Sequence, residues 1–376
     1  MKKIQMVDLI SQYEKIKPQV SEAIASILDK AQFINGPDVH SFREELETYL
    51  DVKHVIPCAN GTDALQIAMM ALDLQPGDEI ITPSYTYIAT TEVIGLLRLK
   101  PVFVDCDPET FNISPEAIRK AITPKTKAIV PVHLYGQACA MEEIMAIAKE
   151  HDLYVLEDNA QAIGCDYTFS DGTKKKTGTI GTIGCTSFFP SKNLGCYGDG
   201  GAICTNDDAL AAKLRMVANH GQSKRYYHDV VGCNSRLDTI QAAVLRIKLR
   251  ELDTYIAARN KAAAYYDNFF AKFDQVTTPF RHSESNHVFH QYTMKLEGID
   301  RDGLVAFLGT KDIPAMIYYP VPAHAQKMFS TLDTRCEDLT TTDWLTERVI
   351  SLPMHTELTE EQLEYICTSV EEYLNK

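Results

Sequence analysis

Several features are scarce or missing in this sequence of 376 residues, and each absence narrows what the chain can be. No stretch is apolar over the length of a membrane-spanning helix, and the two N-terminal lysines, Lys2 and Lys3, are not followed by the apolar run of a signal peptide. Acidic residues outnumber basic ones, and the formal net charge is −14. This charge argues against a surface that binds nucleic acid or an anionic membrane. We therefore expect a cytoplasmic globular protein, in which a few local Arg and Lys residues could still bind a small anion.

The ten cysteines include no Cys-x-x-Cys pair, so the sequence indicates neither a zinc site nor a disulfide framework, and we expect no metal. Several of them fall in apolar, strand-like segments, where a buried reduced thiol is the expected state. The length suffices for a large core and two domains. We place a large α/β domain at residues 1–246 and a smaller α+β domain at 247–376.

Strand-like and helix-like segments alternate with short connections between residues 55 and 156. This alternation is typical of a mostly parallel sheet with helices on both faces. Such sheets bind ligands at the carboxyl ends of their strands. Residues 60–62, 85–87, 158–161 and 187–192 all fall at such ends, and we expect the ligand site there.

The glycine-rich stretch from Ser187 to Ile203 contains a single lysine, Lys192, between two apolar strand patterns. A lysine that forms covalent bonds must be held on a constrained backbone and shielded from water, so that its amine can be neutral. The stretch taken alone is explained better by a glycine-rich surface loop with a solvated lysine. The motifs Asn-Gly-Thr-Asp at 60–63 and Glu-Asp-Asn-Ala-Gln at 157–161 make the first interpretation stronger.

The first of these motifs lies where a short strand, residues 55–59, meets an apolar helix that starts near Ala64. A helix N-terminus after a strand can hold a phosphate through its free N–H groups and its dipole. Capping of the helix by Thr62 or Asp63 would explain the same residues without any ligand.

Elsewhere the pattern predicts helices on both sides of a break at residues 35–37 and an exposed hairpin over 167–178, with Lys174, Lys175 and Lys176 at its tip. Residues 220–236 are expected to be irregular, and 237–270 to form one long helix or two. The closing helix should begin after Thr359, which can cap it.

Five ordered motifs resemble those of one family. They are Asn-Gly-Thr-Asp-Ala-Leu (60–65), Glu-Asp-Asn-Ala-Gln (157–161), Ser-Phe-Phe-Pro-Ser-Lys-Asn-Leu-Gly (187–195), Gly-Asp-Gly-Gly-Ala (198–202) and Asn-Ser-Arg-Leu-Asp (234–238). Together they look like the DegT/DnrJ/StrS family of nucleotide-sugar aminotransferases, which use pyridoxal 5′-phosphate (PLP). The resemblance covers nearly the whole chain and implies the aspartate-aminotransferase-like fold type I, with a mostly parallel seven-stranded sheet.

Carried over position by position, the resemblance implies a catalytic Lys192 that forms an internal aldimine and then moves the proton. Asp158 would pair with the pyridine nitrogen, and Gln161 would hydrogen-bond the phenolic oxygen of the cofactor. Tyr87 would stack on the ring. The phosphate would be held by the set Gly61, Thr62, Asp63 and Ser187.

The resemblance also implies a homodimer with shared active sites, in which Asn234 reaches the phosphate of the neighbouring subunit. From the residues alone, Asn234 could instead cap the following helix. Arg236 matches an arginine on the anionic substrate side, and Tyr318, Tyr319 and His324 match a substrate-facing stretch, although relatives often carry His at the position of Tyr318.

Lys192 stands where the sugar-dehydrating branch of the family has histidine, so the resemblance implies transamination. Residues 220–238 look most like enzymes that aminate the 3-keto group of UDP-2-acetamido-2-deoxy-3-oxo-D-glucuronate with L-glutamate as donor, for a surface polysaccharide such as O-antigen. Arg225 and His228 are candidate substrate ligands, and an exposed basic loop explains them equally well. The alternatives are amination of a 4-keto-6-deoxy sugar or a 3-keto dTDP-sugar, and a regulatory PLP-binding protein.

Overall fold

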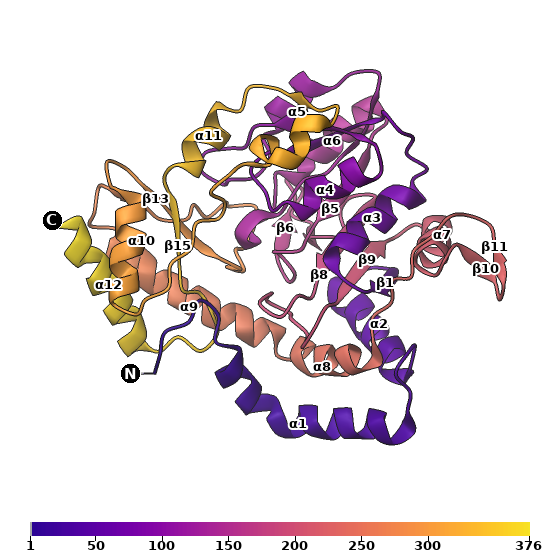
Figure 1. The fold of residues 1–376 in the computed structure, drawn as a ribbon, viewed down its shortest axis with the longest axis horizontal. Coiled ribbons are helices and arrows are strands. Elements are labelled where there is room, and N and C mark those ends of the chain that lie inside the picture. The colour runs from indigo at the N-terminus through magenta and orange to yellow at the C-terminus, as the bar shows by residue number, and fades with distance from the viewer. Residues whose placement is uncertain (1) are drawn as a thin grey trace.

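An eight-stranded sheet forms the centre of the computed structural model, which describes residues 2–376 (Figure 1). Its strands stand in the order β1-β9-β8-β5-β4-β2-β3-β14. Their bounds are β1 (His54–Cys58), β2 (Glu79–Pro83), β3 (Lys100–Val104), β4 (Thr126–Ile129), β5 (Tyr154–Asp158), β8 (Ile183–Ser187), β9 (Gly201–Thr205) and β14 (Arg335–Cys336). β9 pairs antiparallel with both of its neighbours, and the other neighbouring pairs are parallel. The predicted mostly parallel α/β sheet is confirmed.

The predicted number of seven strands is wrong, because the two residues of β14 add an eighth. Arg335 and Cys336 pair in parallel with Val102 and Phe103 of β3. A strand of two residues has no apolar alternation of its own, so its position is decided by the tertiary structure.

The helices follow the predicted pattern in most places. They are α1 (Leu9–Lys30), α2 (Pro37–Leu50), α3 (Gly61–Ala71), α4 (Ala89–Leu96), α5 (Pro115–Ala121), α6 (Met141–His151), α7 (Asp208–Ala218), α8 (Thr239–Leu249), α9 (Leu252–Phe270), α10 (Arg301–Thr310), α11 (Thr340–Thr346) and α12 (Glu360–Leu374), with short 3₁₀ turns η1 (Leu134–Gly136), η2 (Ala323–Ala325) and η3 (Lys327–Thr331). The predicted break stands between α1 and α2, where Gly36 is the N-cap and Pro37 begins α2.

The core lies on both faces of the sheet, because neighbouring residues of a strand point to opposite sides. Ile80 of β2 packs in the cluster that contains residues of α3 and α7, whereas Ile81 packs in the cluster that contains residues of α5 and α6. The same division separates Leu156 from Val155 in β5. Helices on the two faces bury the sheet and leave the carboxyl ends of its strands for a site.

A second, smaller sheet lies with α10, α12 and both chain termini at the left of Figure 1. Its antiparallel strands are β12 (Val276–Thr277), β13 (Tyr292–Leu296) and β15 (Val349–Leu352). Thr359 caps α12 in a capping box with Gln362, as predicted. Ile4 packs into the core of this region, while β14 joins the large sheet. The division at residues 246 and 247 remains a prediction.

Three local expectations need correction. The lysines at 174–176 form strand β7 (Lys174–Lys176), paired with β6 (Asp166–Thr168), so the tip of that hairpin lies at 169–173. Asp238, not Asn234, is the N-cap of α8. Within 220–236 the chain is not irregular throughout, because β10 (Gln222–Lys224) and β11 (Tyr227–His228) form a hairpin that projects at the right of Figure 1.

All ten cysteines are free thiols, and eight of them are buried. Over residues 2–376, no helix combines the length and the apolar character needed to cross a membrane.

Candidate active site

A cavity of about 600 Å³ opens at the carboxyl ends of the parallel strands. It is lined by nine of the residues singled out from the sequence, namely Gly61, Thr62, Tyr87, Asp158, Gln161, Ser187, Lys192, Tyr318 and Tyr319. These nine positions come together from segments that are far apart in the sequence, most of them at the ends of strands of the large sheet.

One end of the cavity is the N-terminus of α3. Asn60 is the N-cap, and its Oδ1 accepts a hydrogen bond of 2.8 Å from the N–H of Asp63, so the expected cap at Thr62 or Asp63 is wrong. Ser187, the last residue of β8, lies against the first turn of the helix, since a Cβ at Gly61 would stand 2.6 Å from the Cβ of Ser187. A helix N-terminus with an adjacent hydroxyl is suited to a phosphate group.

Asp158 ends β5 inside the cavity with only 5% of its surface exposed. Its carboxylate accepts hydrogen bonds from Thr90 Oγ1 at 2.8 Å and from the N–H of Ala160 at 3.1 Å. Burial raises the pKa of Asp158, although these two hydrogen bonds and the charge of Lys192 act in the opposite direction. A cation next to this carboxylate would stabilise the ionised form.

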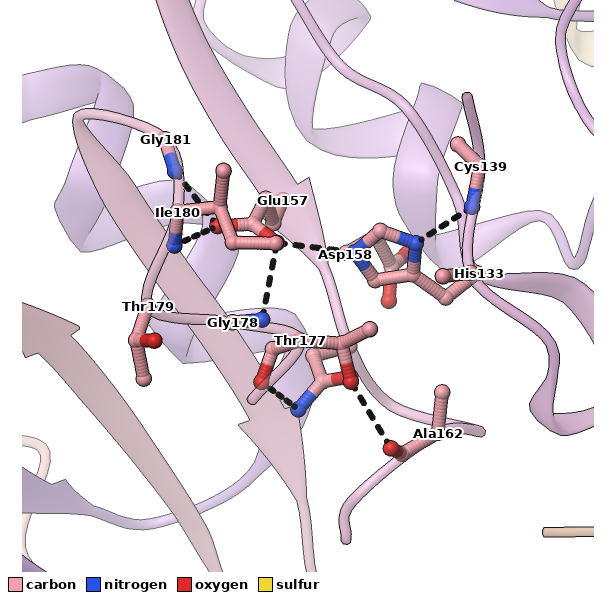
Figure 2. A network of polar contacts seen from close by, with 12 residues as sticks. His133, Cys139, Glu157, Asp158, Ala162, Thr177, Gly178, Thr179, Ile180 and Gly181 are labelled. Atoms are coloured by element: carbon pink, nitrogen blue, oxygen red, sulfur yellow. Dashed lines mark hydrogen bonds and ion pairs between the residues drawn. The ribbon is translucent and has the colours of Figure 1, made fainter. Parts of the chain in front are cut away.

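The preceding residue, Glu157, anchors the same end of β5 through a network of polar contacts (Figure 2). Its buried carboxylate accepts the N–H groups of Gly178, Ile180 and Gly181 at 2.6 to 2.8 Å, and contacts His133 Nε2 at 2.9 Å. The N–H of Cys139 donates to His133 Nδ1, so Nε2 carries a proton and donates to Glu157. With all four donors in place, the backbone at Asp158 is fixed.

Lys192 lies in a loop that is anchored at several points. Asn193 Nδ2 donates to the carbonyl of Val288 at 2.8 Å, and buried Lys248 of α8 donates to the carbonyl of Gly195 at 2.6 Å. Gly195 itself allows the tight turn, because a Cβ there would stand 2.3 Å from the carbonyl oxygen of Pro190. The loop therefore presents Lys192 on the constrained backbone that the sequence suggested.

Burial lowers the pKa of Lys192 to about 8, and the negative charge of Asp158 opposes this shift. An ordinary lysine near pH 8 is almost fully protonated, whereas about half of the Lys192 amines would be neutral. The site thus holds a nucleophilic amine beside a buried carboxylate.

The amide of Gln161 has a defined orientation. The N–H of Tyr135 can only donate, so the Gln161 atom 2.8 Å away from it is Oε1. Gln161 Nε2 then donates to the hydroxyl of Tyr319 at 3.0 Å. One N–H of Gln161 is thus used by Tyr319, and the second N–H remains as a donor for a ligand in the cavity.

Some residues of the site were not found from the sequence. Thr90 binds Asp158, and His290 lines the cavity with 6% of its surface exposed. Burial and the charges of Lys192 and Arg259 hold the pKa of His290 well below its ordinary value. His290 lies outside every recognised motif, while Thr90, four residues after Thr86 at the start of a helix, could have been suspected from its position.

Six other candidate residues lie outside the lining of this cavity. Asp63 accepts a hydrogen bond from Ser235, and His324 Nδ1 contacts Ser84 Oγ at 2.8 Å. Asn234 is exposed. Arg236 donates to Asn219, and Arg225 and His228 belong to the projecting hairpin. Their expected roles remain predictions.

The residues of the cavity fit PLP. The N-terminus of α3 with Ser187 offers a phosphate seat, and Lys192 offers an amine for the aldehyde. The buried carboxylate of Asp158 calls for a cationic partner such as a protonated pyridine nitrogen. Gln161 supplies a donor for an anionic oxygen.

Comparison with known proteins identifies relatives along the whole chain. Residues 14–371 match the model of the DegT/DnrJ/EryC1/StrS aminotransferase family. The chain is 45% identical to a pleiotropic regulatory protein of Geobacillus stearothermophilus, over 98% of both chains. It is 44% identical to the UDP-2-acetamido-2-deoxy-3-oxo-D-glucuronate aminotransferase of Pseudomonas aeruginosa, over 98% of this chain and 99% of that one.

Among solved structures, DesV of S. venezuelae in complex with a ketimine intermediate is similar, with a TM-score of 0.94, 35% identity and full coverage of both chains. The match of family, fold and cavity leads to one conclusion. The chain belongs to the DegT/DnrJ/EryC1/StrS aminotransferase family, and it is a PLP-dependent nucleotide-sugar transaminase.

Proposed function

We propose that this enzyme transfers the amino group of L-glutamate to the 3-keto group of a UDP-linked sugar of the 2-acetamido-3-oxo-glucuronate type. The observation that carries the proposal is the pairing of Lys192 and Asp158 in one cavity at the strand ends. The high similarity to the P. aeruginosa aminotransferase supports the choice of sugar. The aminated product would then serve the assembly of a surface polysaccharide such as O-antigen.

PLP, when bound, supplies the electron sink that stabilises negative charge on the substrate carbon. The amine of Lys192 would accept a proton from that carbon and return it to the cofactor side, which requires the neutral form favoured by its lowered pKa. Asp158 would keep the pyridine nitrogen protonated. Gln161 would orient the ring through its Nε2.

A regulatory role is the second candidate, since the Geobacillus relative is named a pleiotropic regulatory protein. A purely regulatory binder needs no nucleophilic amine beside a buried carboxylate. The intact pair of Lys192 and Asp158, with the lysine pKa lowered to about 8, therefore favours catalysis.

We also propose that the active form is a homodimer that shares residues between its two sites. Among the described residues that line the cavity, Lys192 is the only lysine or arginine. Glutamate, the cofactor phosphate and a diphosphate sugar are all anions, so further cations are needed. We propose that a second copy supplies the neutral amide of Asn234, which is exposed in this chain, and that the cations are Arg236 and Arg225, with His228 beside them in the hairpin.

The first test is the absorption spectrum of the PLP-loaded protein during titration with L-glutamate. We expect the visible band of the bound cofactor to move into the near ultraviolet as 2-oxoglutarate forms, and no such change for Lys192→Ala. An unchanged spectrum in the wild type would remove the aminotransferase proposal and favour the regulatory role.

The sugar is tested separately by single-turnover amination of matched keto sugars. The 3-keto UDP-sugar should be aminated fastest, and a 4-keto-6-deoxy sugar and a 3-keto dTDP-sugar at least about tenfold more slowly, which corresponds to roughly 1.4 kcal/mol. Faster turnover of either of the other two would select that alternative.

A further inference from the structure

Two buried tyrosine hydroxyls meet at one carbonyl oxygen behind the active site. Tyr85 Oη donates to the carbonyl of Tyr318 at 2.7 Å, and Tyr135 Oη donates to the same oxygen. The two hydroxyls are 3.1 Å from each other. Tyr85 and Tyr135 are 1% and 3% exposed, and neither lines the cavity.

The hydroxyls reach this carbonyl from the large sheet. Tyr85 follows β2, and Tyr135 lies in η1 after β4, whereas Tyr318 comes from the segment between α10 and η2. Burial raises the pKa of both phenols, so each keeps its proton and can donate. A carbonyl oxygen has two lone pairs, which is enough for two donors.

The residue after this carbonyl touches the catalytic machinery. The Tyr319 hydroxyl accepts the hydrogen bond from Gln161 Nε2, and Gln161 Oε1 accepts from the N–H of Tyr135. Tyr135 therefore contacts both partners of the hydrogen bond between Gln161 and Tyr319. Its backbone N–H orients the Gln161 amide, and its hydroxyl binds the carbonyl of the residue that precedes Tyr319.

The same residue also seats the segment that carries His290. The carbonyl of Tyr135 accepts the N–H of His290 at 2.8 Å, and the carbonyl of Gly136 accepts the N–H of Val288 at 2.8 Å. A Cβ at Gly136 would stand 3.0 Å from the backbone nitrogens of Phe289 and His290. Both segments that close the cavity from the C-terminal part of the chain thus rest on η1.

We propose that Tyr85 and Tyr135 are positioning residues, which form a clamp on the Tyr318 carbonyl and thereby set the Tyr319 hydroxyl and the Gln161 amide at the cofactor. The inference rests on the proposed contact between Gln161 and the cofactor. If the inference is right, removal of one hydroxyl changes cofactor binding through the position of Tyr319, in addition to any loss of stability.

The test is a double-mutant cycle that combines Tyr135→Phe with Tyr319→Phe, with Tyr85→Phe as a second, independent variant. The readouts are the dissociation constant of PLP, the absorption maximum of the bound cofactor, and kcat and KM for the amino donor. Tyr135→Phe should weaken PLP binding about fivefold, which is the scale of one buried hydrogen bond, and shift the absorption maximum. kcat should fall more than KM rises.

In the Tyr319→Phe background, the same Tyr135→Phe change should alter PLP affinity by less than about twofold, since the route through Tyr319 is already lost. Tyr167→Phe is the matched control, because Tyr167 is equally buried and its hydroxyl contacts Glu284 away from the cavity. It should leave cofactor affinity and spectrum unchanged.

Full additivity in the cycle, or a lower urea midpoint with an unchanged spectrum, would overturn the clamp and leave only a structural role. PLP affinity and spectrum can be measured without any turnover. A failure of the proposed sugar or donor is therefore distinguishable from a failure of the clamp.

Discussion

The reactivity of the Lys192 amine should depend on pH within the range around 8. Its lowered pKa of about 8 means that the neutral, reactive form is lost as the pH falls below 8 and gained as it rises through 8. The rate at which the apoprotein captures PLP, followed by absorption, should therefore rise with pH and level off above about 9, where an ordinary lysine would still be gaining reactivity.

The same pH dependence should be measured for the variant Asp158→Asn. The carboxylate raises the pKa of Lys192, so its neutralisation should move the inflection to lower pH. An inflection near 10 in the wild type, or one that moves upward in the variant, would contradict the assigned environment.

Gly61 gives a second prediction for a single residue. Gly61→Ala places a methyl group 2.6 Å from the Cβ of Ser187, so the phosphate seat must open, and the dissociation constant of PLP should rise about tenfold or more. Gly309→Ala in α10 is the control, since a Cβ there meets nothing within 4 Å and the change favours helix. Calorimetry without PLP measures how each substitution changes stability, and calorimetry with PLP measures how it changes cofactor affinity. Equal cofactor affinity in both variants would refute the close contact at Gly61.

At this scale the sequence was informative about which residues meet and less so about what each one does. Lys192, Asp158 and Gln161 stood in motifs, and all three line one cavity. The cap of α3 was missed because Asn60, Thr62 and Asp63 can all cap a helix. The choice depends on where the backbone leaves the extended conformation, which it does after Asn60 at φ −166°.

At the scale of elements, the end of β5 depends on the buried Glu157. In Glu157→Gln, the new NH₂ group would face two donors, the N–H of Gly178 and His133 Nε2, because both contact the same oxygen. We expect a loss of about 3 kcal/mol in the free energy of unfolding, measured with urea. Glu150→Gln, which removes an exposed ion pair with Arg119, should leave the free energy of unfolding nearly unchanged, because water screens that pair. Similar losses in both variants would show that the network in Figure 2 adds little to stability.

Elements with a strong periodic pattern were predicted well, and those fixed by distant partners were not. The alternation over 55–156 marks strands β1 to β5 because each strand is apolar and bounded by turns. The lysines of β7 carry no strand signal, and they are extended because β6 pairs with them. The helical pattern predicted over 237–270 is confirmed as α8 and α9, but Asn234 is not the cap, because it bridges to Asn219 and the backbone N–H of Ser235 donates to Ala218.

For the whole molecule, the proposed shared sites make a sharp prediction. Lys192→Ala and Asn234→Ala should each be inactive or strongly impaired, since one removes the amine and the other removes a phosphate contact from the neighbouring site. Mixing the two variants after reversible dissociation should restore activity, because a mixed dimer contains one site with neither defect. The expected recovery is about a quarter of the wild-type activity for random pairing, in which half of the dimers are mixed and each has one intact site.

The control for this experiment is a mixture of Lys192→Ala with Lys192→Met, which should stay inactive in every pairing. Analytical ultracentrifugation of the wild type measures its oligomeric state directly. A monomer with full activity, or the absence of recovery in a mixture that forms mixed dimers, would contradict the shared site.

The pairing of β14 with β3 has a consequence for the newly made chain. β3 ends at Val104, and its partner strand at 335–336 is synthesised roughly 230 residues later. At about 5–20 residues per second, the ribosome takes on the order of 10–50 s to add this length. Throughout that interval β3 is an unprotected sheet edge that can pair with another chain. The two residues of β14 therefore decide how long the nascent protein is exposed to aggregation, and a chain cut short before residue 335 would never close that edge.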